Sequence, residues 1–325
     1  MPYPHILSPK PMHIPDGFLS VAVSVVFWVI SVIIILVALK QTKNSLGERQ
    51  VPLMGVLAAA IFAGQMLNFS VTGGTSGHLL GAAIAVILLG PWAAVLVMVS
   101  VVSVQALLFQ DGGILALGAN ILNMAITGVF VAHAINTVLN RLFKKQRWGI
   151  IVSGFTAAWG SIFIAALGCA LQLAISGTSP ANIAIPAMSA IHALIGVGEG
   201  LITAGALAFL LAARKDLLHI GEAQTIGNKG VVAGGLLIAI VLVVFSPLAS
   251  SNPDGLEWVA EKNGFLEAAK GAFYNIIPDY TMPGISDPAI ATIAAGIIGV
   301  VIVFGIAYGI ARFEKRAVSR GINQR

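Results

Sequence analysis

The sequence predicts an all-α integral membrane protein. Three observations lead to this fold class. The chain of 325 residues is 58% hydrophobic and only 10% charged, against roughly 25% charged residues in ordinary soluble domains. Several apolar stretches reach the roughly 20 residues that a helix needs to cross a bilayer. The Lys and Arg residues gather in a few connections between these stretches, which is how loop charge sets membrane orientation. The same composition argues against nucleic acid as a partner and makes membrane lipid the surroundings of the chain.

Seven apolar stretches are long enough to span. They are expected near 19–39, 51–71, 113–139, 149–176, 187–213, 229–248 and 288–312. Residues 77–109 are too long for one ordinary span and contain Gly90-Pro91. Because proline removes a backbone donor and tends to end or kink a helix, this region is expected to cross twice, with a turn at Gly90-Pro91.

Loop charge supports this reading and gives nine spans. Crossing twice between 77 and 109 places every basic connection on one side, which the positive-inside rule assigns to the cytoplasm. The N-terminus and the long loop at 249–287 then face outward, and the C-terminus is cytoplasmic. Four units are therefore expected: an extension at 1–11, a seven-span module at 12–215, a cytoplasmic connector at 216–228 and a two-span module at 229–325.

Two histidines fall on the outer side of this topology. His13 precedes the first span and His78 stands at the outer start of the third. Imidazole is a good ligand for nickel, cobalt, copper and zinc. If Met12 were the true chain start, its amine, the His13 amide and imidazole, and the His78 imidazole would form the square-planar nitrogen set associated with nickel(II) and copper(II).

Met12 follows Pro11 in a peptide bond and so has no free amine in the sequence as written. Met1 cannot replace it, because Pro2 has no amide hydrogen to lose. Three alternatives follow: translation starts at Met12, the extension is removed, or the site is built differently. The first is favoured, since no role is evident for residues 1–11.

Four stretches closely resemble one protein family. They are MHIPDGFLS at 12–20, GQMLNFSVTGGTSGHLLGA from 64, LLGPWAAVLVM at 88–98 and QALLFQDGGILALGANILNMAI at 105–126. Together they resemble the substrate-binding component of energy-coupling-factor transporters for nickel and cobalt, the CbiM/NikM family. The likeness covers about residues 12–215. SSNPDGLEWVAEK at 250–262 resembles the PDGLE segment of the small two-span companion component, the NikN type. The resemblance implies a bundle of seven helices plus two and a metal site at Met12, His13 and His78.

Polar residues within the apolar stretches are candidates to surround the metal, because such side chains usually face a cavity or one another. Gln65, Asn68 and Thr72 recur at helical spacing, which predicts one helix face. Asn120, Asn123 and Thr127 repeat that spacing. Amides suit the task of orienting a ligating histidine, although packing through interhelical hydrogen bonds explains them equally well. The residues predicted to line or rim the pocket are Gln65, Asn68, Thr72, Gln105, Asp111, Asn120 and Asn123.

Three further residues carry weaker signals. Glu199 lies deep in an apolar stretch and is either a structural partner of a neighbouring helix or part of the conformational machinery. His192 is a weaker metal candidate, because nothing in the sequence fixes it near His13. The single cysteine, Cys169, is expected to be a small packed hydrophobe.

The function expected from these observations is capture of Ni²⁺ or Co²⁺ on the outer face for ATP-driven uptake. The metal is cargo, and no permanent cofactor is expected. No GxxxxGK[ST] loop occurs in the sequence, so energy would come from partners. The resemblance implies a CbiQ/NikQ-like transmembrane coupling subunit and a CbiO/NikO-like cytoplasmic ATPase in a bacterial or archaeal plasma membrane. An ATP-independent metal channel or secondary carrier remains the alternative. An intramembrane metalloenzyme is disfavoured because HExxH is absent.

Overall fold

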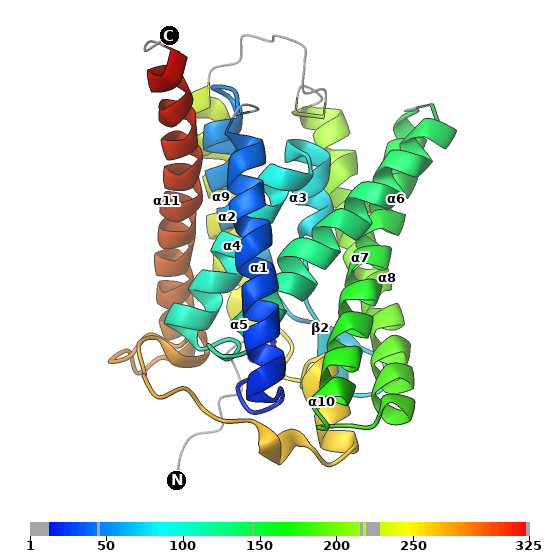
Figure 1. Ribbon diagram of the computed structural model, residues 1–325. Helices are drawn as coiled ribbons and strands as arrows, with labels where there is room; N and C mark the ends of the chain where they lie inside the picture. Colours follow the sequence, from blue (N-terminus) through cyan, green and yellow to red (C-terminus); the bar gives the residue numbers. More distant parts are fainter. Residues whose placement is uncertain (1–12, 44–45, 145, 215–216, 219–227, 323–325) are drawn as a thin grey trace.

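A computed structural model describes residues 13–43, 46–144, 146–214, 217–218 and 228–322 as a bundle of long helices (Figure 1). The helices are α1 (Val21–Thr42), α2 (Gln50–Gln65), α3 (Ala82–Leu89), α4 (Pro91–Val104), α5 (Leu117–Asn120), α6 (Gly128–Leu142), α7 (Arg147–Ile175), α8 (Ala181–Ala213), α9 (Asn228–Phe245), α10 (Gly255–Lys262) and α11 (Pro288–Ile322). Two π-helical segments, η1 (Gln105–Phe109) and η2 (Ile121–Thr127), continue α4 and join α5 to α6. A two-stranded hairpin pairs β1 (Phe69–Val71) with β2 (Thr75–Gly77).

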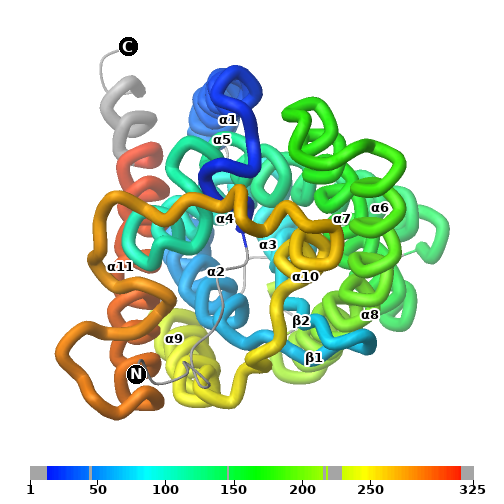
Figure 2. The backbone as a smooth tube through the Cα atoms, turned by 90° about the horizontal axis from the view of Figure 1, so that it is seen from below, coloured from blue at the N-terminus to red at the C-terminus, as the bar shows by residue number. Residues whose placement is uncertain are grey.

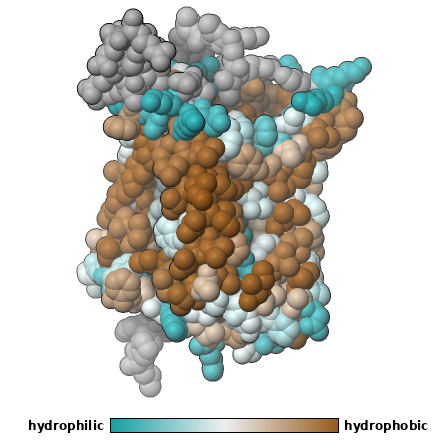
Figure 3. Space-filling model, viewed as in Figure 1, coloured by the Kyte–Doolittle hydropathy of each residue, from teal (hydrophilic) through white to brown (hydrophobic). Residues whose placement is uncertain are grey.

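Within the described residues, seven helices are long and apolar enough to cross a membrane. Large apolar side chains such as Val25, Val29 and Leu36 of α1 are more than half exposed. These side chains contribute to a wide apolar band between two more polar ends (Figure 3). An apolar band of this kind is what contact with lipid requires. The predicted all-α membrane fold is confirmed.

The region 77–109 differs in part from the expectation. The helices break at Gly90, which has a φ of 78°, and α4 begins at Pro91. The segment before the break is not a full-length helix, because α3 has only 8 residues. The chain approaches α3 through non-helical backbone at Gly77–Gly81, where Gly81 has a φ of 83°. Non-helical backbone near membrane depth is tolerated where protein surrounds it, and Leu79, Leu80 and Gly81 are buried here.

The predicted second span also ends earlier than expected. α2 ends at Gln65, and β1 begins at Phe69. Gln65, Asn68 and Thr72 therefore do not share a helix face, and this prediction is wrong. The polar and glycine-rich stretch after Gln65 favours a hairpin, with Gly73 and Gly74 both at positive φ; glycine adopts that conformation without a steric penalty.

The two ends of the bundle differ in charge. We call them the α10 end, where α10 and β2 lie, and the basic end opposite (Figure 1). Basic residues at three connections and in the C-terminal part of α11 lie at the basic end, namely Lys40, Arg49, Arg141, Arg147, Arg214, Lys229, Arg312 and Lys315. Lys262 and Lys270 are at the other end, in and after α10. The grouping of the basic connections at one end is what the positive-inside rule requires.

The last two long helices pack on α2. Three glycines allow these helices to approach α2 closely, because a Cβ atom on any of them would crowd a side chain of the neighbouring helix. A Cβ on Gly55 would lie 3.0 Å from the Phe304 ring, a Cβ on Gly235 would lie 2.0 Å from Val56, and a Cβ on Gly299 would lie 2.1 Å from the Phe62 ring. Residues 249–287 join α9 to α11. After α10 this segment runs across the α10 end of the bundle, past α4, to α11 (Figure 2). The segment therefore covers the end of the bundle at which His13 lies.

Candidate metal centre

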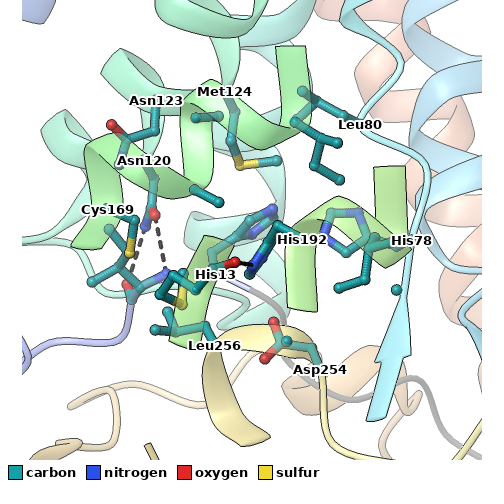
Figure 4. Close-up of a pocket in the computed structure, with 18 of the residues that line it drawn as sticks. His13, His78, Leu80, Asn120, Asn123, Met124, Cys169, His192, Asp254 and Leu256 are labelled. Carbon is teal, nitrogen blue, oxygen red and sulfur yellow. Dashed lines mark hydrogen bonds between the residues drawn. The ribbon is translucent and has the colours of Figure 1, made fainter. Parts of the chain in front are cut away.

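A cavity of about 80 Å³ lies at the α10 end of the bundle. Its polar lining comes from separate parts of the chain (Figure 4). The residues with nitrogen, oxygen or sulfur side chains that line it are His13, Ser76, His78, Asn120, Asn123, Met124, Cys169, Met188, His192 and Asp254. Three of them are histidines, whose imidazoles are common ligands of divalent transition metals.

The N-terminal loop is inserted into the bundle by the turn at Pro15-Asp16-Gly17. Asp16 accepts hydrogen bonds from the backbone N–H groups of Ile114 (3.1 Å) and Ala116 (3.0 Å). Ile14 exchanges hydrogen bonds with the side chain of Asn120, at 3.0 and 3.1 Å. These contacts fix the backbone on both sides of Pro15 and place His13 against the cavity.

Asp111 holds His13 by both its ring and its backbone. The His13 amide donates to Asp111 Oδ1 at 3.2 Å. His13 Nδ1 lies 3.1 Å from the Asp111 carbonyl oxygen and 3.0 Å from Oδ1. Because both neighbours accept hydrogen bonds, we assign the ring proton to Nδ1. The other ring nitrogen, Nε2, is buried and has no hydrogen-bond partner, so its lone pair is available in the cavity.

The charge of Asp111 also changes the acidity of this ring. Burial lowers the pKa of His13, but the charge and hydrogen bonds of Asp111 outweigh burial, so the pKa is raised above its ordinary value. Burial raises the pKa of the Asp254 carboxyl to about 8. Asp111 supplies a counter-charge to His13, and a divalent cation in the cavity would supply one to the Asp254 carboxylate.

His78 reaches the cavity from the loop between β2 and α3. The His13 and His78 ring centroids are 6.0 Å apart, with an interplanar angle of 86°. This separation fits two imidazoles on one ion, because a metal–nitrogen bond of about 2 Å adds to the ring radius on each side. His78 Nδ1 lies 3.0 Å from the Leu79 carbonyl, which assigns the proton to Nδ1 and leaves Nε2 as the acceptor. Within the described residues, no group of three or more His, Cys, Asp or Glu side chains is arranged to hold a metal. Any site built here therefore depends on these rings together with other donors.

The structure places only two of the other predicted pocket residues at the cavity. Asn120 and Asn123 line the cavity. Gln65 is buried and donates to the Leu80 carbonyl at 2.8 Å. Thr72 is exposed in the hairpin turn. Asn68 and Gln105 are buried but do not line the cavity. Asp111 does not line it either, and instead accepts a hydrogen bond from the His13 backbone N–H. Met12 lies outside the described residues.

Four residues that the sequence left undecided or passed over contribute to the centre. His192 lines the same cavity as His13, with Nδ1 2.9 Å from the Met188 carbonyl of its own helix. Nothing in the sequence placed His192 near His13, but the structure places both residues at one cavity. Glu199 accepts hydrogen bonds from the backbone N–H groups of Leu80 (2.6 Å) and Gly81 (3.1 Å), which lie two and three residues after His78.

The other two are Gln172 and Tyr280. Asn123 and Gln172 exchange two amide hydrogen bonds of 2.8 Å. Tyr280 is fully buried and donates to Asp111 Oδ2 at 2.5 Å. Spacing along the chain gave no signal for either, because each partner lies on a distant element.

The segment at 249–287 forms one wall of the cavity. Asn252 and Pro253 accept hydrogen bonds from Ser76, through its hydroxyl at 2.9 Å and its N–H at 2.8 Å. A Cβ on Gly255 would lie 2.9 Å from the His192 ring. Asp254, Gly255 and Leu256 therefore form part of the cavity wall.

Comparison with known proteins places this arrangement in a family. The family model described as the cobalt uptake substrate-specific transmembrane region, CbiM, matches residues 13–217. The chain belongs to the CbiM family. The PDGLE domain model matches residues 229–316, so this CbiM-family chain is continuous with a second module. The predicted resemblance is confirmed.

Relatives of this CbiM-family chain are named for metal transport. It is 35% identical over 321 residues to the putative fused nickel transport protein NikMN of Archaeoglobus fulgidus, covering 94% of this chain and all of that one. It is 32% identical over 294 residues to the fused nickel transport protein NikMN of Rhodobacter capsulatus, covering 84% of each. A crystal structure of a truncated transition metal transporter is 36% identical, with a TM-score of 0.56, and covers 62% of this chain and 99% of that one.

Proposed function

We propose that this chain is the substrate-specific component of an ATP-driven energy-coupling-factor importer, and that it captures Ni²⁺ or Co²⁺ at the outer face of the plasma membrane. One observation carries the proposal. The rings of His13 and His78, from segments far apart in the sequence, meet at one cavity with centroids 6.0 Å apart. The names of the relatives, nickel and cobalt transport proteins, supply the class of cargo.

The proposed ligands are the amine of Met12, the amide and imidazole of His13, and the imidazole of His78. A chelate ring that includes the His13 amide closes through Nδ1, the nearer ring nitrogen. Both atoms lie against Asp111 Oδ1, so chelation requires them to turn from Asp111 to the ion. The alternative is binding through His13 Nε2, which already lacks a partner. A planar nitrogen set favours nickel.

The arrangement of charge supports the proposed orientation. The basic end is assigned to the cytoplasm and the α10 end to the outside, because loop Lys and Arg favour the cytoplasmic side. The N-terminus then lies outside and the C-terminus inside. Energy for transport would come from a CbiQ/NikQ-like coupling subunit and a CbiO/NikO-like ATPase, and this chain would select the metal without catalysing a reaction of its own.

Nickel retention by the purified full chain tests the site. His78→Ala is expected to lower the affinity for Ni²⁺ more than about 100-fold, because loss of a ligand should exceed the 10- to 100-fold effect of losing a residue that orients one. His133→Ala, in α6 and away from the cavity, is the matched control and should retain nickel. Equal retention by the two variants would refute the site.

Uptake into liposomes tests the mechanism. The chain reconstituted with its coupling subunit and ATPase is expected to import nickel only when ATP is supplied. Import by the chain alone would instead identify an ATP-independent channel or carrier. The intact mass of the purified protein decides whether the Met12 amine is free, since a chain that begins at Met12 is lighter by residues 1–11.

A further inference from the structure

A groove of about 790 Å³ lies at the basic end of the bundle, opposite the candidate metal centre. Its walls are the start of α9 and the C-terminal half of α11, and the start of α2 lies between them. The three helices lie side by side (Figure 1). α9 and α11 are in close contact nearer the α10 end, where a Cβ on Gly296 would lie 2.7 Å from Val243. The groove occupies the space between the same helices at the basic end.

The inner part of the groove is apolar. α2 contributes Val51 and Pro52, which are both buried. α9 contributes Val232 and α11 contributes Phe304, and these two side chains are partly exposed in the groove. Because transfer of apolar surface from water to an apolar environment is favourable, this part of the groove suits a hydrocarbon chain.

Both walls change from apolar to basic toward the end of the bundle. On α11, Phe304, Tyr308 and Arg312 line the groove at a spacing of four residues, which places them on one helix face. At a rise of about 1.5 Å per residue, this face extends for about 12 Å from the aromatic to the basic residue. On α9, Lys229 precedes Val232 by one turn. A ligand that follows these walls meets apolar side chains first and cations last.

The outer part of the groove carries an excess of positive charge. Lys229, Arg312 and Lys315 line it together with Glu48, which pairs with Lys315. Arg312 donates to the neutral Tyr308 hydroxyl at 2.8 Å. Among the described residues, neither Lys229 nor Arg312 forms an ion pair. An anionic group bound between them would supply the missing negative charge.

These cations stand at the border of the apolar band. The candidate membrane span of α9 begins at Lys229, and that of α11 ends at Lys315. Lipid headgroups lie just outside the hydrocarbon core of a bilayer. The basic part of the groove is therefore at the level of lipid phosphates, and its apolar part is at the level of acyl chains.

We propose that this groove binds an anionic phospholipid, with the phosphate between Lys229 and Arg312 and an acyl chain along the apolar walls. Basic pockets between membrane helices bind anionic lipid headgroups in this way. A soluble anion would leave the apolar walls in water, and a zwitterionic lipid would bring no net negative charge. The site is separate from the metal centre and does not depend on the ion that the chain carries.

Three variants distinguish this groove from the general charge of the basic end. Lys229→Gln with Arg312→Gln removes two cations from the groove. The matched control, Arg141→Gln with Arg147→Gln, removes two cations from the same end of the bundle but outside the groove. Ala233→Trp fills the groove and leaves every charge in place, because Ala233 is exposed and lines it.

Native mass spectrometry of the full chain in detergent measures the binding of phosphatidylglycerol, an anionic probe, and of phosphatidylcholine, its zwitterionic counterpart. The unchanged chain and the Arg141/Arg147 control are expected to bind phosphatidylglycerol more tightly. The Lys229/Arg312 variant should bind it about 25-fold more weakly, which is about fivefold for each cation lost near an anionic headgroup. Ala233→Trp should weaken the binding of both lipids, and it decides the matter even if the Lys229/Arg312 variant does not fold.

Four results would overturn the proposal. Equal weakening in the Arg141/Arg147 control would mean that the whole basic end attracts the lipid. Equal affinity of the unchanged chain for the two lipids, or binding of neither, would exclude an anionic phospholipid as the occupant. Undiminished binding by Ala233→Trp would place the lipid elsewhere. Displacement of phosphatidylglycerol by an excess of inorganic phosphate would identify a free anion as the ligand.

Discussion

The two-span module meets the rest of the molecule at two interfaces of opposite character. Between the long helices, α9 and α11 contact α2 through glycines set against large apolar side chains, such as Gly299 against Phe62. At the α10 end, residues 249–287 meet the seven-helix module through hydrogen bonds to Ser76, Asp111 and Ala106. In the first interface the modules are held together mainly by close apolar packing, with an ion pair between Lys315 of α11 and Glu48 just before α2. In the second interface, directional hydrogen bonds fix the positions of individual atoms.

The interface between the long helices therefore attaches the two modules to each other, and the interface at the α10 end positions residues of the candidate metal centre. In lipid, helices associate through close packing, since lipid tails are as apolar as the side chains. Hydrogen bonds have defined directions and partners, and here two of them lead to residues at the cavity. Changes to the helix interface should therefore lower stability with little effect on metal retention. Changes at the α10 end should mainly weaken metal retention and lower stability less.

The largest loss of stability is expected for Gly299→Ala. A Cβ there would lie 2.1 Å from Phe62 and 2.9 Å from Phe109, both fully buried rings. Overpacking of this kind typically costs 1–3 kcal/mol, and the upper end, about 3 kcal/mol, is expected. Gly305→Ala in the same helix has no atom within 4 Å and serves as the control. Thermal melting measures the loss, and nickel retention by Gly299→Ala close to that of the control would support the separation. A tenfold fall in retention would contradict it.

Glu199→Gln tests a directional contact within the seven-helix module. Glu199 accepts the N–H groups of Leu80 and Gly81, and a glutamine would set its own amide donors against one of them. A buried donor left without an acceptor costs about 2 kcal/mol. Because Leu80 lies two residues after His78, nickel retention should fall as well. The exposed Glu261 provides the control, since Glu261→Gln should alter neither melting nor retention. Normal retention by Glu199→Gln would show that the loop stays in place without this contact.

The sequence predicted the membrane fold well because its signal is local. Length and hydropathy identified α1 and α7 within a few residues and the C-terminal end of α8, and Gly90-Pro91 marked a real break. The errors fell at Gln65–Val71 and Gly77–Gly81, where the backbone leaves the helix inside a largely apolar stretch. Hydropathy alone does not distinguish a buried loop from a helix, and the glycines at 73, 74 and 81 were the available signal.

The candidate centre was predicted only in part, for a different reason. His13 and His78 were paired because topology placed both at one side of the membrane. His192 and Asp254 line the same cavity, but their approach depends on how α8 and the PDGLE segment pack, which no spacing along the chain encodes. Tyr280 was missed because its partner, Asp111, lies 169 residues away.

Gly255→Ala is expected to have a smaller effect on stability. Its Cβ would lie 2.8 Å from Ile195 Cδ1 and 2.9 Å from the His192 ring. These atoms are at the ends of side chains, so about 1 kcal/mol is expected, at the low end of overpacking effects. The shifted wall should weaken nickel retention several-fold, as measured by dialysis. Gly271→Ala, in the same segment with no atom within 4 Å, should behave as the unchanged chain; a similar loss in both would mean that the segment as a whole, and not its contact with His192, matters.

The smallest effect distinguishes buried from exposed hydrogen bonds between the modules. Ser70 donates to the Ser250 hydroxyl at 3.0 Å in an exposed position, whereas Ser76 is fully buried and donates to the Asn252 carbonyl at 2.9 Å. Ser70→Ala should lower stability by less than about 0.5 kcal/mol, as surface substitutions usually do. Ser76→Ala leaves the partly buried Asn252 carbonyl without this donor and should lower stability by about 1 kcal/mol. Thermal melting of the two variants side by side gives the comparison. Because water can replace the hydroxyl at Ser70 and cannot easily do so at Ser76, equal melting temperatures would mean that water reaches the contact between Ser76 and Asn252.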